Sequence, residues 1–248
     1  MQTDSLYTSM AGLQAITARM QAVASNLANA QTPGYAAVQA MTQPDFYEGS
    51  NAPAGADAAA LNAGPDLTQG PPQHTGDPMN VALSGDAWLQ VQTAAGNALT
   101  RDGSLSISAA GMLTDSGGNP ILGTGGQPIS LPPLAKLEIG ADGTVSGVAA
   151  ANPGGPAQSY GQIALMATPP GTLTSLSGTL YAPPAGASLS PSSDGALHQG
   201  YLNDSNVDPT QSMIEMIDDS RSYQLQTDMM KTQGTSSQDL NTLVAQAQ

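Results

Sequence analysis

Apolar residues recur with a seven-residue spacing over the first thirty residues of the chain. One set of apolar side chains repeats every seven positions, and a second set follows three positions behind it. The pattern comprises Leu6, Leu13, Ile16, Met20, Val23 and Leu27. This spacing predicts an amphipathic helix over residues 4–30 that lies along another helix. Its other faces carry almost no charge, which indicates that they too have neighbours.

A second long helix is predicted at the other end of the chain. Asp208 can cap its first turn, Pro209 suits the first helical position, and Gln211 has the spacing of a capping box. Its apolar positions are Met213, Ile214, Met216, Ile217, Tyr223, Met230, Leu240 and Leu243. Neither helix can bury its apolar stripe alone, and isolated helices are marginal in water. We therefore expect residues 1–32 and 207–248 to pair as an α-helical coiled-coil domain whose apolar residues form the assembly interface.

Between the two helices the pattern changes to short alternating stretches. Leu105 and Ile107 alternate with serines, as in a half-buried strand, and Asp142-Gly143 is typical of a hairpin turn. Residues 33–76 lack periodicity and are rich in Ala, Pro and Gly, which predicts a linker or extended connector. The fold class expected is α+β, with a mainly antiparallel β domain at 77–206 inserted between long paired terminal helices.

Composition limits the functions that the chain can have. Five basic residues against nineteen acidic ones give a net charge of −14, which argues against nucleic acid or an anionic membrane as a partner. The absence of cysteine excludes disulfides and thiolate metal sites. No stretch approaches the ~20 apolar residues of a membrane span. The N-terminus lacks the basic region and apolar run of a cleaved secretory signal.

Candidate chemistry is scarce. His74 and His198 are the only histidines, and neither has a second histidine within four residues. A zinc site or a catalytic triad needs convergent ligands that this spacing does not supply. Asp102-Gly103 and Asp142-Gly143 lack the spacing of a calcium loop. We therefore expect no enzyme, no catalytic residue, no cofactor and no metal.

Three parts of the chain resemble one protein family. The segment Asn-Leu-Ala-Asn-Ala-Gln-Thr-Pro-Gly-Tyr at 26–35 is similar to the N-terminal signature of the flagellar rod, hook and hook-filament family. The matching positions are Asn26, Leu27, Ala28, Asn29, Thr32, Gly34 and Tyr35. Leu-Thr-Arg-Asp-Gly-Ser-Leu at 99–105 and the segment 200–209 resemble further segments of the same family. The resemblance covers residues 1–35, 77–148 and 200–248.

The resemblance implies a structural subunit of the bacterial flagellar rod, of the proximal-rod type. Such a subunit would assemble through its terminal helices, with other rod subunits and with itself, into a tubular shaft in the periplasm. It would be exported by the flagellar type III apparatus without a cleaved signal. Two alternatives remain open. A distal-rod or hook-type protein of the same family would share these motifs, and a secreted β-domain adhesin or binding module with coiled-coil ends would instead show a ligand pocket.

Overall fold

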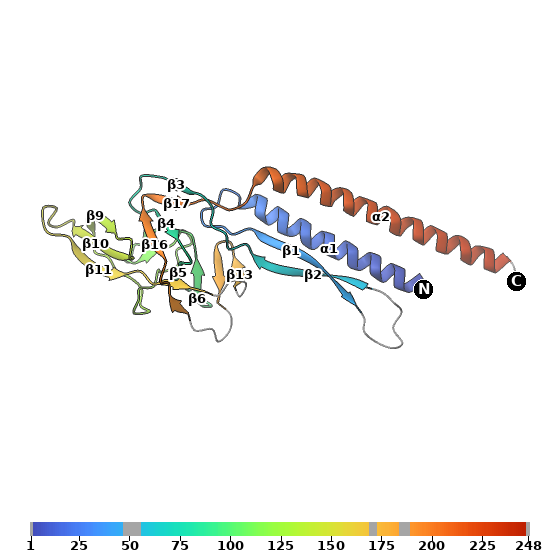
Figure 1. The fold of residues 1–248 in the computed structure, drawn as a ribbon, viewed down its shortest axis with the longest axis horizontal. Coiled ribbons are helices and arrows are strands. Elements are labelled where there is room, and N and C mark those ends of the chain that lie inside the picture. The colour runs from blue at the N-terminus through green and yellow to red at the C-terminus, as the bar shows by residue number, and fades with distance from the viewer. Residues whose placement is uncertain (1, 47–55, 169–172, 184–188, 247–248) are drawn as a thin grey trace. The chain divides into compact units, whose positions relative to one another are not determined.

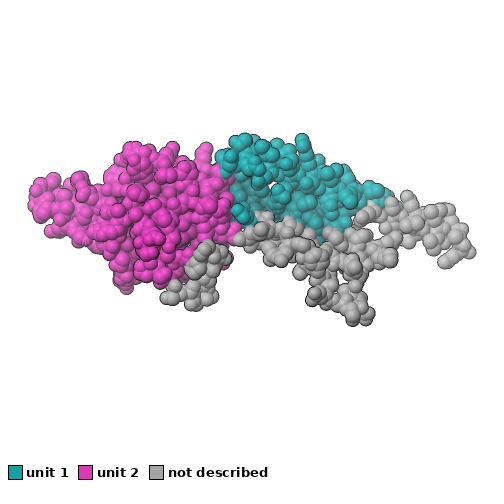
Figure 2. Space-filling model, in the orientation of Figure 1, with its two compact units in different colours: residues 1–28, 38–63, 208–248 teal, residues 29–37, 64–207 magenta. Residues whose placement is uncertain are grey.

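The computed structural model of the chain describes residues 2–46, 56–168, 173–183 and 189–246 (Figure 1). Side-chain surroundings are described for residues 9–39, 64–168, 173–183, 189–232 and 234–235. The chain forms two compact units, which Figure 2 colours separately. Unit 1 comprises residues 1–28, 38–63 and 208–248, and unit 2 comprises residues 29–37 and 64–207. The backbone therefore passes from one unit to the other after residues 28, 37, 63 and 207.

Unit 1 contains two helices and a two-stranded sheet. Its elements are α1 (Gln2–Ala28), β1 (Val38–Phe46), β2 (Ala56–Pro65) and α2 (Pro209–Gln246). β1 pairs with β2, and α1 lies beside both α2 and β1 (Figure 1). α1 ends four residues before Thr32, whose helical conformation is disfavoured because Pro33 follows it.

The prediction that paired terminal helices form a coiled-coil domain is wrong. The described residues contain two helices, one at each end, and a body made mostly of β-strands. A coiled coil needs large apolar residues to bury one another along a seam. Instead α2 buries Ser212 and Asp219, while Met213, Ile214 and Ile217 remain exposed. Unit 1 is also not purely helical, because it includes β1 and β2.

Residues 33–76, predicted as a linker or extended connector, contain three strands. These are β1, β2 and β3 (Pro72–His74). β3 pairs antiparallel with β17 (Tyr201–Asn203), more than a hundred residues along the chain. β1 and β2 pair with each other. For β3, the distant partner strand rather than the local Pro-rich sequence sets the conformation, so no periodic signal marks it. The predicted domain limits stay a prediction about which segments fold independently.

Unit 2 is built from short antiparallel strands. Its remaining elements are β4 (Val81–Ser84), β5 (Trp88–Thr93), β6 (Gly96–Thr100), β7 (Ser106–Ile107), β8 (Leu113–Thr114), β9 (Leu134–Ile139), β10 (Thr144–Ala149), β11 (Gln158–Gln162), β12 (Leu165–Ala167), β13 (Thr174–Ser177), β14 (Leu180–Ala182), β15 (Ser190–Pro191) and β16 (Ala196–Gln199). The largest sheet has the order β13-β14-β6-β5-β12-β15, and a second has the order β11-β10-β9. The strand pairs β16-β4, β17-β3 and β7-β8 complete the unit.

Two buried apolar clusters hold unit 2 together. The larger cluster gathers aliphatic side chains such as Leu83, Leu89 and Val145. The smaller cluster comprises Ala36, Trp88, Leu99, Leu173 and Tyr181. Because Ala36 comes from the segment that follows α1 in sequence, the smaller cluster fixes that connecting segment to the sheet of β5, β6 and β14.

Candidate assembly surface

One face of α2 buries polar side chains. Ser212 and Asp219 are buried, and Gln226 is half-buried. These residues are seven apart, so they lie on one side of the helix. Gln226 donates from Nε2 to the carbonyl of Ser9 in α1, 3.3 Å away. The side of α2 that faces α1 therefore carries polar residues at these three positions, which alternate along the helix with the half-buried Met216 and Met230.

The opposite face of α2 is open to solvent and carries large apolar residues among polar ones such as Arg221 and Gln224. Met213, Ile214, Ile217 and Leu225 are between 50 and 67% exposed. At about 100° per residue these four positions lie opposite the polar face defined by Ser212. We call them the apolar face of α2. Soluble proteins rarely expose a group of large apolar side chains on one face unless it binds another molecule.

A groove adjoins this apolar face within unit 1. Its volume is about 490 Å³. It is lined by Leu27, Met213, Met216, Ile217, Ser220, Arg221 and Gln224. Leu27 comes from the last turn of α1, so both helices contribute. The groove brings together four large apolar residues that the sequence pattern assigned to the assembly interface.

The other predicted interface residues have varied surroundings. Val23 is buried in α1, and Tyr223 on α2 is exposed. The half-buried members are Leu13, Ile16, Met20, Leu27, Met216 and Met230. Leu6, Leu240 and Leu243 belong to the two helices, but their side chains lie outside the described surroundings. The residues predicted as one seam are thus distributed over buried, half-buried and exposed positions.

An ion pair joins the two helices at their polar contact. Arg19 Nε lies 3.2 Å from Asp219 Oδ1, and the Asp219 side chain is only 6% exposed. Asp219 Oδ2 is buried and has no hydrogen-bond partner among the described residues. Burial raises the pKa of Asp219, and the Arg19 charge opposes that rise. A buried carboxylate with only one of its oxygens paired contributes little net stability. This ion pair therefore affects the relative position of the two helices more than the free energy of their association.

The motif residues in the last turn of α1 and just after it form a turn and hydrogen-bond to the first residue of β1. Asn26 accepts a hydrogen bond from Val38 N at 2.8 Å and donates to Val38 O at 3.0 Å. Thr32 N donates to the carbonyl of Asn29 at 3.0 Å. Gly34 has a φ of +69°, and a Cβ there would lie 2.4 Å from the backbone of Arg101. Of the other motif positions, Ala28 is exposed, Leu27 is half-buried, and Tyr35 is buried.

Unit 2 holds three connecting segments together at what we call the connector junction: residues 29–37, 64–70 and 203–207. Gly34 N donates to Asn203 O at 2.9 Å, and Asp66 N donates to Ala37 O at 2.7 Å. A Cβ at Gly70 would lie 2.0 Å from Asp204 O, so only glycine permits this approach. The three segments therefore pack backbone against backbone.

Arg101, Trp88 and Tyr181 attach the connector junction to the sheet. Arg101 Nη1 donates to Leu67 O at 2.5 Å, and the guanidinium lies 4.2 Å from the centre of the Trp88 ring. Trp88 meets Tyr181 edge-on at 5.3 Å. The Tyr181 hydroxyl accepts a hydrogen bond from Ala36 N at 3.2 Å. Burial lowers the pKa of Arg101 and raises the pKa of Tyr181 to about 12.

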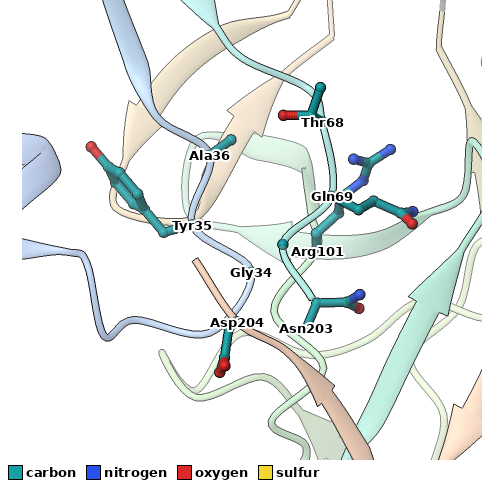
Figure 3. A pocket seen from close by; sticks show the side chains of 9 residues that line it. Gly34, Tyr35, Ala36, Thr68, Gln69, Arg101, Asn203 and Asp204 are labelled. Atoms are coloured by element: carbon teal, nitrogen blue, oxygen red, sulfur yellow. The ribbon is translucent and has the colours of Figure 1, made fainter. Parts of the chain in front are cut away.

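A small cavity lies at the connector junction (Figure 3). Its volume is about 10 Å³, which suits about one water molecule. It is lined by Gly34, Tyr35, Ala36, Thr68, Gln69, Gly70, Arg101, Asn203 and Asp204. Arg101 Nε is buried there without a hydrogen-bond partner in the described ranges. The cavity is too small for an organic ligand.

Sequence reasoning missed the buried polar residues of α2 and the role of Arg101. The seven-residue spacing of Ser212, Asp219 and Gln226 is visible in the sequence, but polar residues at such a spacing normally mark a solvated face.

Within the described ranges, no three His, Asp or Glu side chains cluster so as to hold a metal ion. No helix in the described part of the chain is both long and apolar enough to cross a membrane.

Comparison with known families matches three parts of the chain. Residues 6–35 match the family described as "Flagella basal body rod protein". Residues 82–147 match "Flagellar hook protein FlgE/F/G D1 domain", and residues 198–243 match "Flagellar basal body rod FlgEFG protein C-terminal". The matched ranges include the motif after α1, the strands around Trp88 and Arg101, and most of α2.

Individual relatives match over most of their length. The "Flagellar basal-body rod protein FlgF" of Escherichia coli (strain K12) is 36% identical over 233 residues, which are 89% of this chain and 90% of the relative. FlgF of Mesorhizobium japonicum is 30% identical, covering 95% of each chain. The "Flagellar basal-body rod protein FlgG" of Bacillus subtilis (strain 168) is 29% identical, covering 95% of this chain and 97% of the relative.

Proposed function

The chain belongs to the family of flagellar basal-body rod proteins, and on that premise we propose that the apolar face of α2 and its adjoining groove contact neighbouring rod subunits. The chain is a FlgF-like structural subunit of the flagellar basal-body rod. As a member of this family it assembles with other rod and hook components. The observation that carries the proposal is that α2 exposes Met213, Ile214, Ile217 and Leu225 to solvent while it buries Ser212 and Asp219.

The exposed apolar residues can supply substantial binding energy. Fully burying a Leu, Ile or Met side chain contributes about 1.5–3 kcal/mol. Since Met213, Ile214, Ile217 and Leu225 are about half covered already, roughly 1 kcal/mol per side chain remains to be gained on contact. Association costs translational and rotational freedom, so the groove and further contacts must contribute as well. A repeated contact between different surfaces of successive subunits builds a tube.

We also propose that, within the family, the chain is a subunit of the proximal rod. Relatives named FlgF are 28–36% identical to the chain, and relatives named FlgG are 29–30% identical. The upper end of the FlgF range supports the proximal type. We further propose that the chain reaches the periplasmic part of the rod through the flagellar type III export apparatus, without a cleaved signal. It has no enzymatic activity in this role.

Charged substitutions on α2 test the proposed interface. Ile217→Asp and Met213→Asp would each place an unpaired charge in a buried contact, which costs several kcal/mol. We expect both variants to be exported but absent from isolated basal bodies, and the cells to be non-motile. The matched control is Ser222→Asp, which adds the same charge at an exposed polar position of α2 outside the apolar face.

Two controls make the result interpretable. Unit 2 should unfold at the same urea concentration in every variant, as reported by the fluorescence of the single tryptophan, Trp88. Secretion of the variants into the medium separates a defect in assembly from a defect in export. A fully motile Ile217→Asp strain with normal rods would overturn the proposed role of the apolar face.

A further inference from the structure

Two consecutive backbone amides are held by asparagine side chains from opposite ends of the chain. Ala37 N donates to Asn206 Oδ1 at 2.7 Å, and Val38 N donates to Asn26 Oδ1 at 2.8 Å. Ala37 is the last residue of its segment of unit 2, and Val38 is the first residue of the following segment of unit 1. Each hydrogen bond lies within a single unit. The backbone is thus anchored on both sides of the position where it passes between units.

The Asn26 carboxamide acts as a short piece of β-ladder. Its Oδ1 accepts from Val38 N, and its Nδ2 donates to Val38 O at 3.0 Å. A neighbouring strand would satisfy the same two groups in the same way. β1 begins at Val38. Asn26, in the last turn of α1, therefore pairs with the residue at which the strand starts.

The Asn206 carboxamide joins three connecting segments of unit 2. Besides accepting from Ala37 N, it donates from Nδ2 toward Asp66 O at 2.9 Å and Thr68 O at 3.0 Å. Thr68 Oγ1 lies within 3.1 Å of the same nitrogen. Only a carboxamide offers an acceptor oxygen and two donor hydrogens at this size. Replacement by aspartate keeps the acceptor oxygen and removes both donor hydrogens. Replacement by alanine removes the acceptor and the donors.

We infer that Asn26 and Asn206 are positioning residues for rod assembly. Their side chains fix the backbone conformation at residues 37 and 38. This inference rests on the proposed function and extends it from the contact surface to the chain that leads into it. It assigns a physical task to one asparagine from each terminal motif. Neither side chain needs to touch a neighbouring subunit for the effect to occur.

Hydrogen exchange of single amides tests the inference in the full chain. Asn206→Ala should accelerate exchange at Ala37, and Asn26→Ala should accelerate exchange at Val38, each by about tenfold as expected for losing one hydrogen bond. Asn206→Asp should leave Ala37 protected, because the acceptor remains, while it still loses the bonds to Asp66 and Thr68. The matched control is Asn97→Ala, at an exposed position of β6 opposite Gln92 of β5, which should change neither amide.

The functional readout is incorporation into basal bodies, compared with the melting of unit 2. We expect both alanine variants to be incorporated less well than Asn97→Ala while the Trp88 unfolding transition stays cooperative. If Asn206→Ala fails to fold, Asn206→Asp and Asn26→Ala carry the test. Unchanged exchange at both amides, or faster exchange with normal incorporation, would overturn the inference. Normal incorporation of Ile217→Asp would instead overturn the proposed interface, so the two failures are distinguishable.

Discussion

Replacing Tyr181 by Phe removes a single hydrogen bond from the connector junction. Tyr181 is 1% exposed, and its hydroxyl accepts the hydrogen bond of Ala36 N at 3.2 Å. Phenylalanine keeps the ring, and with it the edge-on contact to Trp88 at 5.3 Å and an angle of 71°. The substitution therefore isolates the polar contribution of the hydroxyl from the packing of the ring.

The loss should amount to about 1–2 kcal/mol of unfolding free energy. A buried amide left without an acceptor costs about 1–3 kcal/mol. The rather long bond to Tyr181 and the removal of a buried hydroxyl both place the loss in the lower part of that range. The pKa of Tyr181 is raised to about 12, so its hydroxyl stays protonated at neutral pH. Because the folded state holds this proton more tightly than the unfolded state, wild-type stability should fall relative to Tyr181→Phe as the pH rises from about 10 to 12.

Urea unfolding of the full chain, followed by Trp88 fluorescence, measures this loss. Trp88 is the single tryptophan and lies in the same cluster as Tyr181, so its signal reports the unfolding of unit 2. The control is Tyr201→Phe, at a tyrosine that is exposed on β17, where the change should stay within ~0.5 kcal/mol. A loss below ~0.3 kcal/mol for Tyr181→Phe would mean that the hydroxyl does not hold Ala36, since neighbouring packing is unchanged.

Three further substitutions have definite expected results. Gly34→Ala should destabilise unit 2 by more than ~1 kcal/mol, because its left-handed φ disfavours a side chain and its Cβ would clash with Arg101; Gly118→Ala, with a similar φ but open space around it, should lose less in the same urea assay. Burial raises the pKa of Asp102, so the cost of its charge disappears as the pH falls through that raised value. The difference in unfolding free energy between Asp102→Asn and wild type should therefore favour the variant most near neutral pH and shrink on acidification. A difference that does not depend on pH would contradict this. Asp208→Ala removes the acceptor of two amides in the first turn of α2 and should destabilise that turn by about 0.5–2 kcal/mol, seen as faster amide exchange at residues 210 and 211.

Local signals in the sequence predicted the first residue of α2 and the turn between β9 and β10 correctly. α2 begins at Pro209, and the Asp208 carboxylate accepts hydrogen bonds from Thr210 N and Gln211 N, as its capping position predicted. The capping box itself does not form, because Gln211 Nε2 donates to Glu215 instead. β9 and β10 pair across Asp142-Gly143, with Gly143 at a φ of +85°. These features depend on neighbouring residues, so the sequence determines them directly.

Which apolar residues of α2 remain exposed could not be predicted. Periodicity shows which residues share a face, but not whether that face meets the same chain or another molecule. The prediction assumed that Met213 and Ile217 face α1, whereas Ser212 and Asp219 take that position. Under the proposed function, the exposed apolar residues of α2 contact a neighbouring subunit. The sequence pattern alone does not distinguish such a neighbour from the chain's own α1.

Long-range polar contacts left no pattern to find. Asn26 and Asn206 stand in recognisable motifs, yet their bonds reach Val38 and Ala37, which are unremarkable apolar residues. The Arg101 guanidinium likewise donates a hydrogen bond to the backbone carbonyl of Leu67. Backbone groups are present at every position, so the sequence does not specify which of them a polar side chain will bind.

The central claim is that the apolar face of α2 becomes covered when the subunit enters the rod. Because the chain has no cysteine, Ile217→Cys introduces a single thiol at a position that is half exposed in the subunit. Its rate of reaction with a maleimide can be compared between the purified subunit and isolated basal bodies that contain it. We predict rapid labelling of the subunit and strong protection in the basal body. Equal labelling rates in the two states, with the variant incorporated normally, would contradict the claim.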